Sequence, residues 1–167
     1  MLYFIDTEFS ERGPEYPLLL ISLALVAEDG REFYAIHSEV SPDDCNDWVR
    51  ANVLPHLDLN DGWDRRCALD EMATQVELFC DPERYGKPKF VGYYSDYDWV
   101  VFAQIFGTMM DLPKGFPMYC LDIKQWCDQL GNPTLPKQTT TEHNALHDAR
   151  WNKQAWEFLS AREKGER

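Results

Sequence analysis

The sequence predicts an α/β domain in which a mixed β-sheet is flanked by helices. Three observations support this prediction. The first forty residues contain three strand-like apolar runs, and two of these flank an Asp-Gly turn. Helix and strand patterns then alternate to the end of the chain. The 167 residues, 44% hydrophobic and 14% aromatic, suffice for one domain with a single core and exclude a disordered chain.

The N-terminal part is expected to form three adjacent antiparallel strands. Leu2–Ile5 is a short apolar run typical of a buried strand, and residues 11–17 after it form a polar loop with prolines. Leu18–Ala27 and Arg31–Val40 flank the turn sequence Glu28-Asp29-Gly30. Two strand-like runs around Asp-Gly predict a β-hairpin.

Two helices are expected next. Ser41 suits a helix cap with Pro42 at the first helical position, and this helix would run to about Val53. Residues 57–63 are acidic and predict a loop. Asp64–Cys80 has apolar residues at helical spacing and predicts a second helix.

The C-terminal half alternates strands with helices, which completes a five-stranded sheet. Trp99–Phe106 is apolar nearly all round, so this helix is expected to be buried. The other expected elements, in order, are a strand at Lys89–Tyr94, a short fifth strand within Lys114–Leu121, a helix at Asp122–Leu130 and a last helix that begins between Thr139 and Asn144 and ends near Arg162.

The charge of the chain restricts its partners. The formal net charge is −13, which argues against a general nucleic-acid coat protein. All of this excess lies in residues 1–114, whereas residues 115–167 carry equal numbers of acidic and basic side chains. A polyanionic substrate would therefore approach through the C-terminal third or across bound metal ions.

The five cysteines and the apolar runs favour a cytoplasmic protein. The cysteine count is odd and no pair has C-x-x-C spacing, which argues against a zinc ribbon or redox site and favours free thiols. The longest apolar run, Leu18–Ala27, is too short to span a membrane, and the N-terminus lacks a secretory signal pattern.

Two carboxylates follow the first strand. Asp6 and Glu8 are two residues apart, so on a strand their side chains point the same way. Like charges this close repel each other, and a hard divalent cation with oxygen ligands would relieve the repulsion. The alternative is a pair of solvated acids at a strand exit.

Asp98 lies where a strand gives way to a helix. Open α/β sheets bind ligands beyond the carboxyl ends of their strands, which makes this acid a candidate ligand. The alternative is helix capping, because an acid at a helix start accepts hydrogen bonds from free N–H groups. Asp96 is the better cap candidate of the two.

The last helix carries a further acid with a histidine before it. Asp148 has small neighbours on this helix, which would let it face inward. His143 precedes it by five residues and could lean over the same site from the helix entry. The helix dipole there disfavours a positive imidazole, which suits a general base. The alternative is a surface histidine, and His147 is a competitor that is expected to point elsewhere.

Together these motifs resemble the DEDDh 3′–5′ exonucleases. The resemblance is carried by Asp6-x-Glu8, Asp98 and His143-x4-Asp148, in this order, and covers essentially the whole chain. It implies a ribonuclease H-like fold with a five-stranded mixed sheet led by a hairpin, in one domain of residues 1–167. Many members have Asn where this chain has Tyr94, which keeps Asp96 as an alternative second-motif ligand.

The resemblance also implies a mechanism and a set of site residues. His143 would deprotonate the attacking water, and nucleoside 5′-monophosphates would leave one at a time from a 3′ end. Thr7 and Phe9 would contact the terminal nucleotide together with Glu8 and His143, Phe9 by stacking. Two Mg²⁺ or Mn²⁺ ions would be held by Asp6, Glu8, Asp98 and Asp148.

Finer expectations come from the sequence around these motifs, which is most similar to the polyadenylate-specific branch, ribonuclease AS. This branch implies single-stranded RNA, adenylate preference and a homodimer. Lys137, Arg150 and Lys153 are candidate phosphate contacts in the neutral C-terminal segment. Alternatives are a DNA exonuclease, an oligoribonuclease-like enzyme, a small-molecule metallophosphatase or nucleotide pyrophosphatase, and a non-catalytic nucleic-acid-binding protein.

Overall fold

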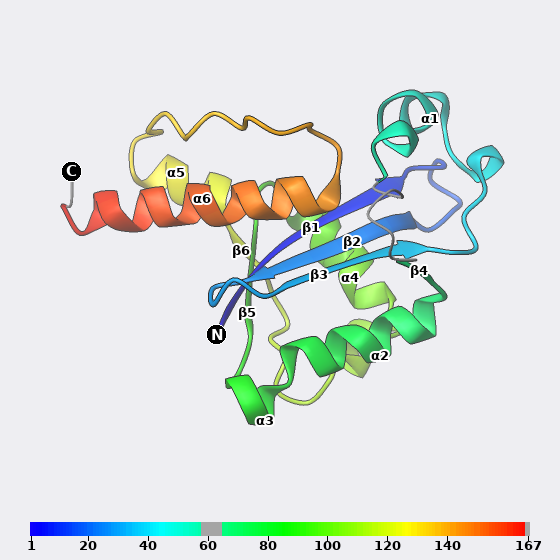
Figure 1. Cartoon of the computed structure of the whole chain (residues 1–167), viewed down its shortest axis with the longest axis horizontal. Helices are drawn as coiled ribbons and strands as arrows, with labels where there is room; N and C mark the ends of the chain where they lie inside the picture. Colours follow the sequence, from blue (N-terminus) through cyan, green and yellow to red (C-terminus); the bar gives the residue numbers. More distant parts are fainter. Residues whose placement is uncertain (58–64, 166–167) are drawn as a thin grey trace.

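A mixed six-stranded sheet forms the centre of the molecule. The computed structural model describes residues 1–57 and 65–165. The strand order is β4-β3-β2-β1-β5-β6. Helices α5 and α6 cover one face of the sheet, and α2 and α4 cover the other (Figure 1). The predicted α/β class with a mixed sheet and flanking helices is confirmed.

The first three strands form the expected antiparallel unit. They are β1 (Leu2–Ser10), β2 (Leu19–Ala27) and β3 (Glu32–His37). In the turn between β2 and β3, the N–H of Gly30 donates to the carbonyl of Ala27 at 3.0 Å. Gly30 has φ of +91°, a backbone conformation that suits glycine. The hairpin predicted at Asp-Gly is therefore confirmed.

Within residues 1–57 and 65–165 the sheet has six strands, so the prediction of five was wrong. Strands β5 (Lys89–Gly92) and β6 (Leu121–Asp122) pair in parallel with β1 and with each other. The additional strand is β4 (Arg66–Cys67), which pairs in parallel with β3. This segment was predicted to be helical. Two residues are too short to show a strand period, and their pairing partners lie about thirty positions earlier in the chain.

The helices follow the expected order with shifted ends. In chain order they are η1 (Pro42–Asp44), α1 (Asp47–Asn52), η2 (Leu54–His56), α2 (Leu69–Cys80), α3 (Pro82–Tyr85), α4 (Asp96–Gln104), η3 (Met109–Asp111), α5 (Ile123–Gln129) and α6 (Ala145–Glu163). The single helix expected from Ser41 to Val53 is divided. Ser41 caps η1 only, and Asn46 caps α1 as a new start. The acidic loop expected at 57–63 lies almost wholly outside the described residues.

Helix α4 is less buried than predicted. Val101, Phe102 and Ala103 are buried, but Val100 is 48% exposed because only one side of the helix faces the sheet. The cap also differs from the expectation, since the N-cap residue is Ser95 rather than Asp96.

The sheet separates two apolar cores. Tyr3 and Ile5 of β1 pack in the core with α2 and α4, whereas Phe4 packs in the core with α5 and α6. All five cysteines are free thiols, as predicted. Among residues 1–57 and 65–165, no helix combines the length and the apolar character that crossing a bilayer requires.

Candidate active site

The central strand β1 carries two of the candidate ligands. Alternate residues of a strand face opposite sides, so Asp6 and Glu8 follow Phe4 onto the side of α6. The pairing of β1 with β2 shifts register between Glu8 and Phe9, which is an irregularity of the bulge type. Such bulges re-aim side chains at the end of a strand.

Helix α6 brings a third carboxylate to this place. Its first turns lie close to the sheet because Ala145 and Ala149 are small and fully buried. The side-chain N–H of Asn152 also donates to the carbonyl of Ile5 at 2.9 Å. As a result, single oxygens of Asp6, Glu8 and Asp148 lie within 4.8 Å of one another. Asp148 faces inward, as its small neighbours suggested.

Asp98 is hydrogen-bonded to Thr7, the residue of β1 between Asp6 and Glu8. Its Oδ1 accepts hydrogen bonds from the backbone N–H of Thr7 at 2.8 Å and from the Thr7 hydroxyl at 2.6 Å. Asp98 is only 8% exposed. Of the two acids considered for this position, Asp98 is therefore the one held against the site.

Burial and mutual repulsion act on the acids of β1. Burial, followed by the charges of Asp98, Glu8 and Asp148, raises the pKa of Asp6 well above its usual range. Burial together with Asp148 and Asp98 raises the pKa of Glu8 to about 8. Strongly shifted carboxyl groups that converge in this way are typical of functional sites.

The pKa values of Asp98 and Asp148 are also raised, but hydrogen bonds to their carboxylates oppose the rise. Burial raises the pKa of Asp98 to about 6, and the hydrogen bonds from Thr7 oppose this rise. Burial also raises the pKa of Asp148, whereas hydrogen bonds from Gln138 and from the backbone of His143 lower it. In all four acids, burial is the largest cause of the raised pKa.

His143 stands at the entrance of α6. It precedes the N-cap residue Asn144 and has φ of +63°, an uncommon conformation for a residue other than glycine. Its backbone N–H donates to Oδ2 of Asp148 at 3.0 Å, and its ring lies beside the ring of Trp48. The Nδ1 of the competitor His147 lies 3.3 Å from the carbonyl of Thr141, and its exclusion from the site stays a prediction.

A cavity of about 480 Å³ adjoins the acids. It is lined by Asp6, Tyr93, Gln138, Glu142, His143, Asp148, Trp151 and Asn152. Sequence reasoning missed Gln138, whose side-chain amide donates to Oδ1 of Asp148. Gln138 lies in a loop without any periodic pattern, so no signal in the sequence marked it.

The remaining sequence candidates have other partners in the structure. The Thr7 hydroxyl donates to Asp98, and the ring of Phe9 is stacked on Tyr97 with centroids 5.6 Å apart. The predicted contacts of Thr7 and Phe9 with a nucleotide stay predictions, as does the phosphate contact of Lys137.

Two of the predicted phosphate contacts are in fact structural. Arg150 donates to both carboxylate oxygens of Glu32 at 2.7 and 2.6 Å. Lys153 donates to the carbonyl of Glu28 at 3.0 Å. Both side chains therefore attach α6 to the β2–β3 hairpin, Arg150 through an acidic side chain and Lys153 through a backbone carbonyl.

Comparison with known proteins identifies the family. Residues 1–160 match the family described as the 3'-5' exoribonuclease Rv2179c-like domain. The chain belongs to this family. The 3'-5' exoribonuclease Rv2179c of Mycobacterium tuberculosis strain H37Rv is 35% identical over 152 residues, which are 90% of this chain and 88% of the relative. The 3'-5' exoribonuclease MT2234.1 of strain CDC 1551 matches to the same extent.

A solved structure shares the fold at low sequence identity. A chain in the structure of the yeast NOT1 MIF4G domain co-crystallized with CAF1 aligns with a TM-score of 0.51 and 15% identity. The alignment covers 98% of this chain and 80% of that chain. This similarity concerns the fold alone.

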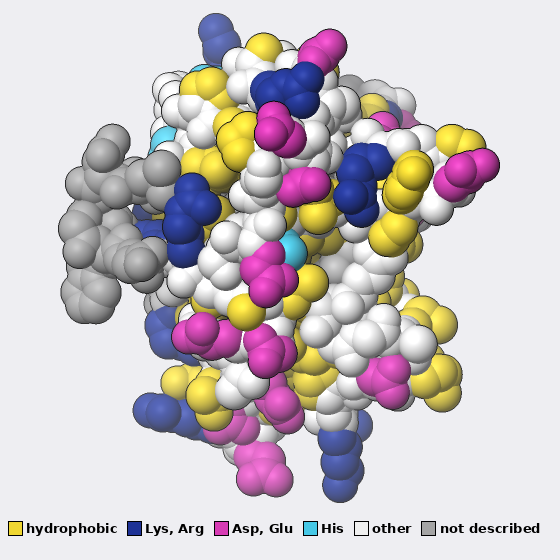
Figure 2. All heavy atoms as spheres, turned by 90° about the vertical axis from the view of Figure 1, so that its right-hand side faces the viewer, with side chains coloured by type: hydrophobic (Ala, Val, Ile, Leu, Met, Phe, Trp, Pro, Cys, Tyr) yellow, Lys and Arg dark blue, Asp and Glu magenta, His cyan; other side chains and the backbone are white. Residues whose placement is uncertain are grey.

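Charged side chains of both signs lie on the face at the end of β1. Figure 2 shows acidic side chains along the middle of this face, with lysine and arginine side chains around them.

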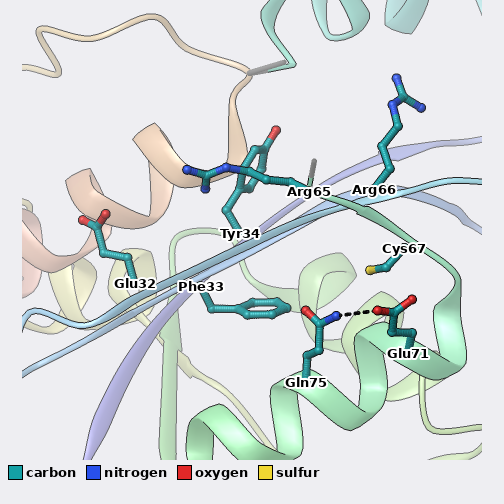
Figure 3. A pocket seen from close by; sticks show the side chains of 8 residues that line it. All are labelled: Glu32, Phe33, Tyr34, Arg65, Arg66, Cys67, Glu71 and Gln75. Atoms are coloured by element: carbon teal, nitrogen blue, oxygen red, sulfur yellow. Dashed lines mark hydrogen bonds between the residues drawn. The ribbon is translucent and has the colours of Figure 1, made fainter. Parts of the chain in front are cut away.

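A second cavity, of about 360 Å³, lies elsewhere at the β3–β4 edge (Figure 3). Its lining includes Arg65 over the ring of Tyr34 and a hydrogen bond from Gln75 to Glu71. None of the candidate catalytic residues lines it, so the cavity beside the acids is the candidate active site.

Proposed function

We propose that this protein is a metal-dependent 3′–5′ exoribonuclease of the DEDDh type, with a ribonuclease H-like fold. The observation that carries the proposal is the convergence of Asp6, Glu8 and Asp148, with Asp98 tied beside them and His143 at the cavity wall. The names of the Mycobacterium relatives support RNA as the substrate and 3′–5′ as the direction.

The donor set fits divalent metal ions. The four acids offer only oxygen, the ligand type that Mg²⁺ and Mn²⁺ prefer. Burial and the neighbouring carboxylates raise the pKa values of Asp6 and Glu8, and a bound cation would favour their ionised forms. Two bound ions would supply Lewis-acid stabilisation of the charge that develops during phosphodiester hydrolysis. Asp6, Glu8, Asp98 and Asp148 would hold them.

The protein's own groups account for the remaining chemistry. His143 borders the same cavity as Asp6 and Asp148, where its imidazole would accept the proton of the attacking water. Thr7 keeps one oxygen of Asp98 fixed. Gln138 and the backbone of His143 fix the two oxygens of Asp148. Asp98 and Asp148 are thus held in place before substrate binds, which favours catalysis.

The finer substrate assignment rests on the resemblance to ribonuclease AS. We propose a single-stranded RNA 3′ end, preferably adenylate, with Phe9 stacking on the terminal base. Stacking of a base on an aromatic side chain contributes about 1–3 kcal/mol and needs no basic surface. We also propose a homodimer on the same resemblance.

A substrate panel tests the proposed function. The substrates are 5′-labelled A-, C- and U-rich RNA oligomers and matching DNA, with Mn²⁺ or Mg²⁺. We expect a ladder of single-nucleotide steps, fastest on oligo-A RNA and abolished by EDTA. A ladder on every substrate would retain the mechanism and remove the adenylate claim. Absence of any ladder with folded, metal-supplemented protein would refute the exonuclease function and favour a binding protein.

Metal ions are expected to stabilise the protein more at high pH than at low pH. Glu8 has a pKa of about 8 in the folded chain and 4.5 as its ordinary value, so between these values the folded chain holds a proton that the unfolded chain has lost. The stability of the metal-free protein therefore falls as pH rises from about 4.5 to about 8. A metal ion at 100 times its Kd would add about 2.7 kcal/mol.

Thermal unfolding with and without Mn²⁺ measures this effect. At 2–4 °C per kcal/mol, we expect Tm to rise by about 5–10 °C at pH 8 and by much less at pH 5. An equal rise at both pH values would argue against binding at these carboxylates.

Thr7→Val is expected to weaken the site without unfolding the chain. Valine has nearly the shape of threonine but cannot donate to Asp98, whose Oδ1 then keeps only the backbone N–H. Loss of a group that orients a ligand typically lowers metal affinity or activity 10–100-fold. Activity titrated with Mn²⁺ measures this change. Thr7→Ser keeps a hydroxyl and is the matched control, so equal losses in both variants would contradict this role.

A further inference from the structure

Trp48 is a large apolar side chain left at the surface beside the candidate base. It is 54% exposed, and its ring centroid lies 5.0 Å from that of His143 with the ring planes at 81°. This is the edge-to-face arrangement that aromatic pairs prefer. The small core beneath α1 is built from other residues, among them Val49 and Val53. The packing of α1 therefore does not explain Trp48.

The segment from Asn46 to His56, which includes the helix that carries Trp48, is attached to both parts of the active site. At one end, the backbone N–H of Asn46 donates to the Ser10 hydroxyl at 3.1 Å, and its side-chain amide donates to the carbonyl of Glu11 at 3.2 Å. At the other end, the side-chain amide of Asn144 donates to the carbonyl of His56 at 2.7 Å. The segment from α1 to η2 thus connects the end of β1 with the turn that holds His143.

The backbone of His143 is held more firmly than its ring. Its N–H is bonded to Asp148, and its neighbour Asn144 caps α6 and bonds to His56. Within residues 1–57 and 65–165, the imidazole of His143 makes no hydrogen bond, and its ring contact is with Trp48. The indole is therefore placed to restrict rotation of the imidazole.

We propose that Trp48 is a positioning residue for His143, which keeps the imidazole directed toward the cavity beside the acids. This inference rests on the proposed function. Among the described residues, Trp48 is not one of those that line the cavity beside the acids, so it is expected to act on His143 rather than on the substrate. Loss of Trp48 should therefore lower kcat and leave KM unchanged.

Steady-state kinetics on oligo-A RNA with Mn²⁺ test this role. We expect Trp48→Ala to lower kcat three- to tenfold with unchanged KM, and Trp48→Phe to restore most of the loss because it keeps an aromatic ring. The matched control is Asn52→Ala in the same helix, because the Asn52 amide bonds only the carbonyl of Trp48 and not its ring. This control should behave as wild type.

A double-mutant cycle shows whether Trp48 acts through His143. If it does, Trp48→Ala should cause no further loss in a His143→Asn background. An undiminished loss there, a rise in KM, or an unchanged kcat in Trp48→Ala would overturn the proposal.

NMR of the imidazole Cε1–H signals provides a readout that does not depend on activity. The chain has four histidines, and His143→Asn identifies the signal of His143. Removal of the indole should shift that signal and leave the other three in place. An unshifted signal would overturn the positioning role even if the protein had no nuclease activity. If His143→Asn were fully active but the His143 signal shifted in Trp48→Ala, the proposed catalytic role of His143 would fail, whereas the contact between Trp48 and His143 would stand.

Discussion

Asp6→Asn is expected to abolish exonuclease activity while leaving the protein folded. Asp6 contributes an oxygen to the group formed with Glu8 and Asp148, and its charge is part of what would hold the metal ions. The amide keeps the size of the side chain but removes that charge. We expect kcat/KM on oligo-A RNA to fall by at least about 10³-fold, which corresponds to roughly 4 kcal/mol of transition-state stabilisation.

The same substitution should make the metal-free protein more stable. Burial and the surrounding carboxylates raise the pKa of Asp6, so this side chain lowers the stability of the fold once pH exceeds the ordinary pKa of an aspartate. Asp6→Asn should therefore raise Tm in EDTA at pH 8 and reduce the Tm increase on adding Mn²⁺. Asp43→Asn, in exposed η1, is a control that should change neither quantity. Near-normal activity in Asp6→Asn would contradict the assignment of this site.

Features set by local spacing could be predicted from the sequence. The i, i+2 relation of Asp6 and Glu8 follows from the period of a strand, and β1 carries both on one side. The small residues around Asp148 predicted its inward orientation, which the burial of Ala145 and Ala149 explains. The Asp-Gly sequence predicted the hairpin because the residues of a turn themselves determine which turn forms.

Features that depend on distant partners could not be predicted. Strand β4 exists because Arg66 and Cys67 pair with β3, and two residues carry no period of their own. Arg150 was assigned to phosphate from the neutral charge of its segment, yet its partner Glu32 is 118 residues away. Gln138 and Trp48 contact the site from segments without a motif, so only the fold reveals them.

His143→Asn is expected to impair proton transfer but to leave metal binding intact. Asparagine accepts positive φ more readily than most residues, so it suits the backbone at φ +63°, where alanine would add strain. The variant lacks an imidazole but keeps the backbone N–H that bonds Asp148. Removal of a general base typically lowers the rate 10²–10⁴-fold, and we expect kcat to fall within this range.

Two measurements distinguish this loss from damage to the metal site. The Mn²⁺-induced rise in Tm should persist in His143→Asn, whereas Asp6→Asn should reduce it, because only the second substitution removes a candidate metal ligand. The affinity for oligo-A RNA, measured with Ca²⁺ in place of Mn²⁺, should also stay close to that of wild type. If His143→Asn lost the Tm rise together with its activity, the substitution would have disturbed the metal site, and the loss of activity would no longer support His143 as the base.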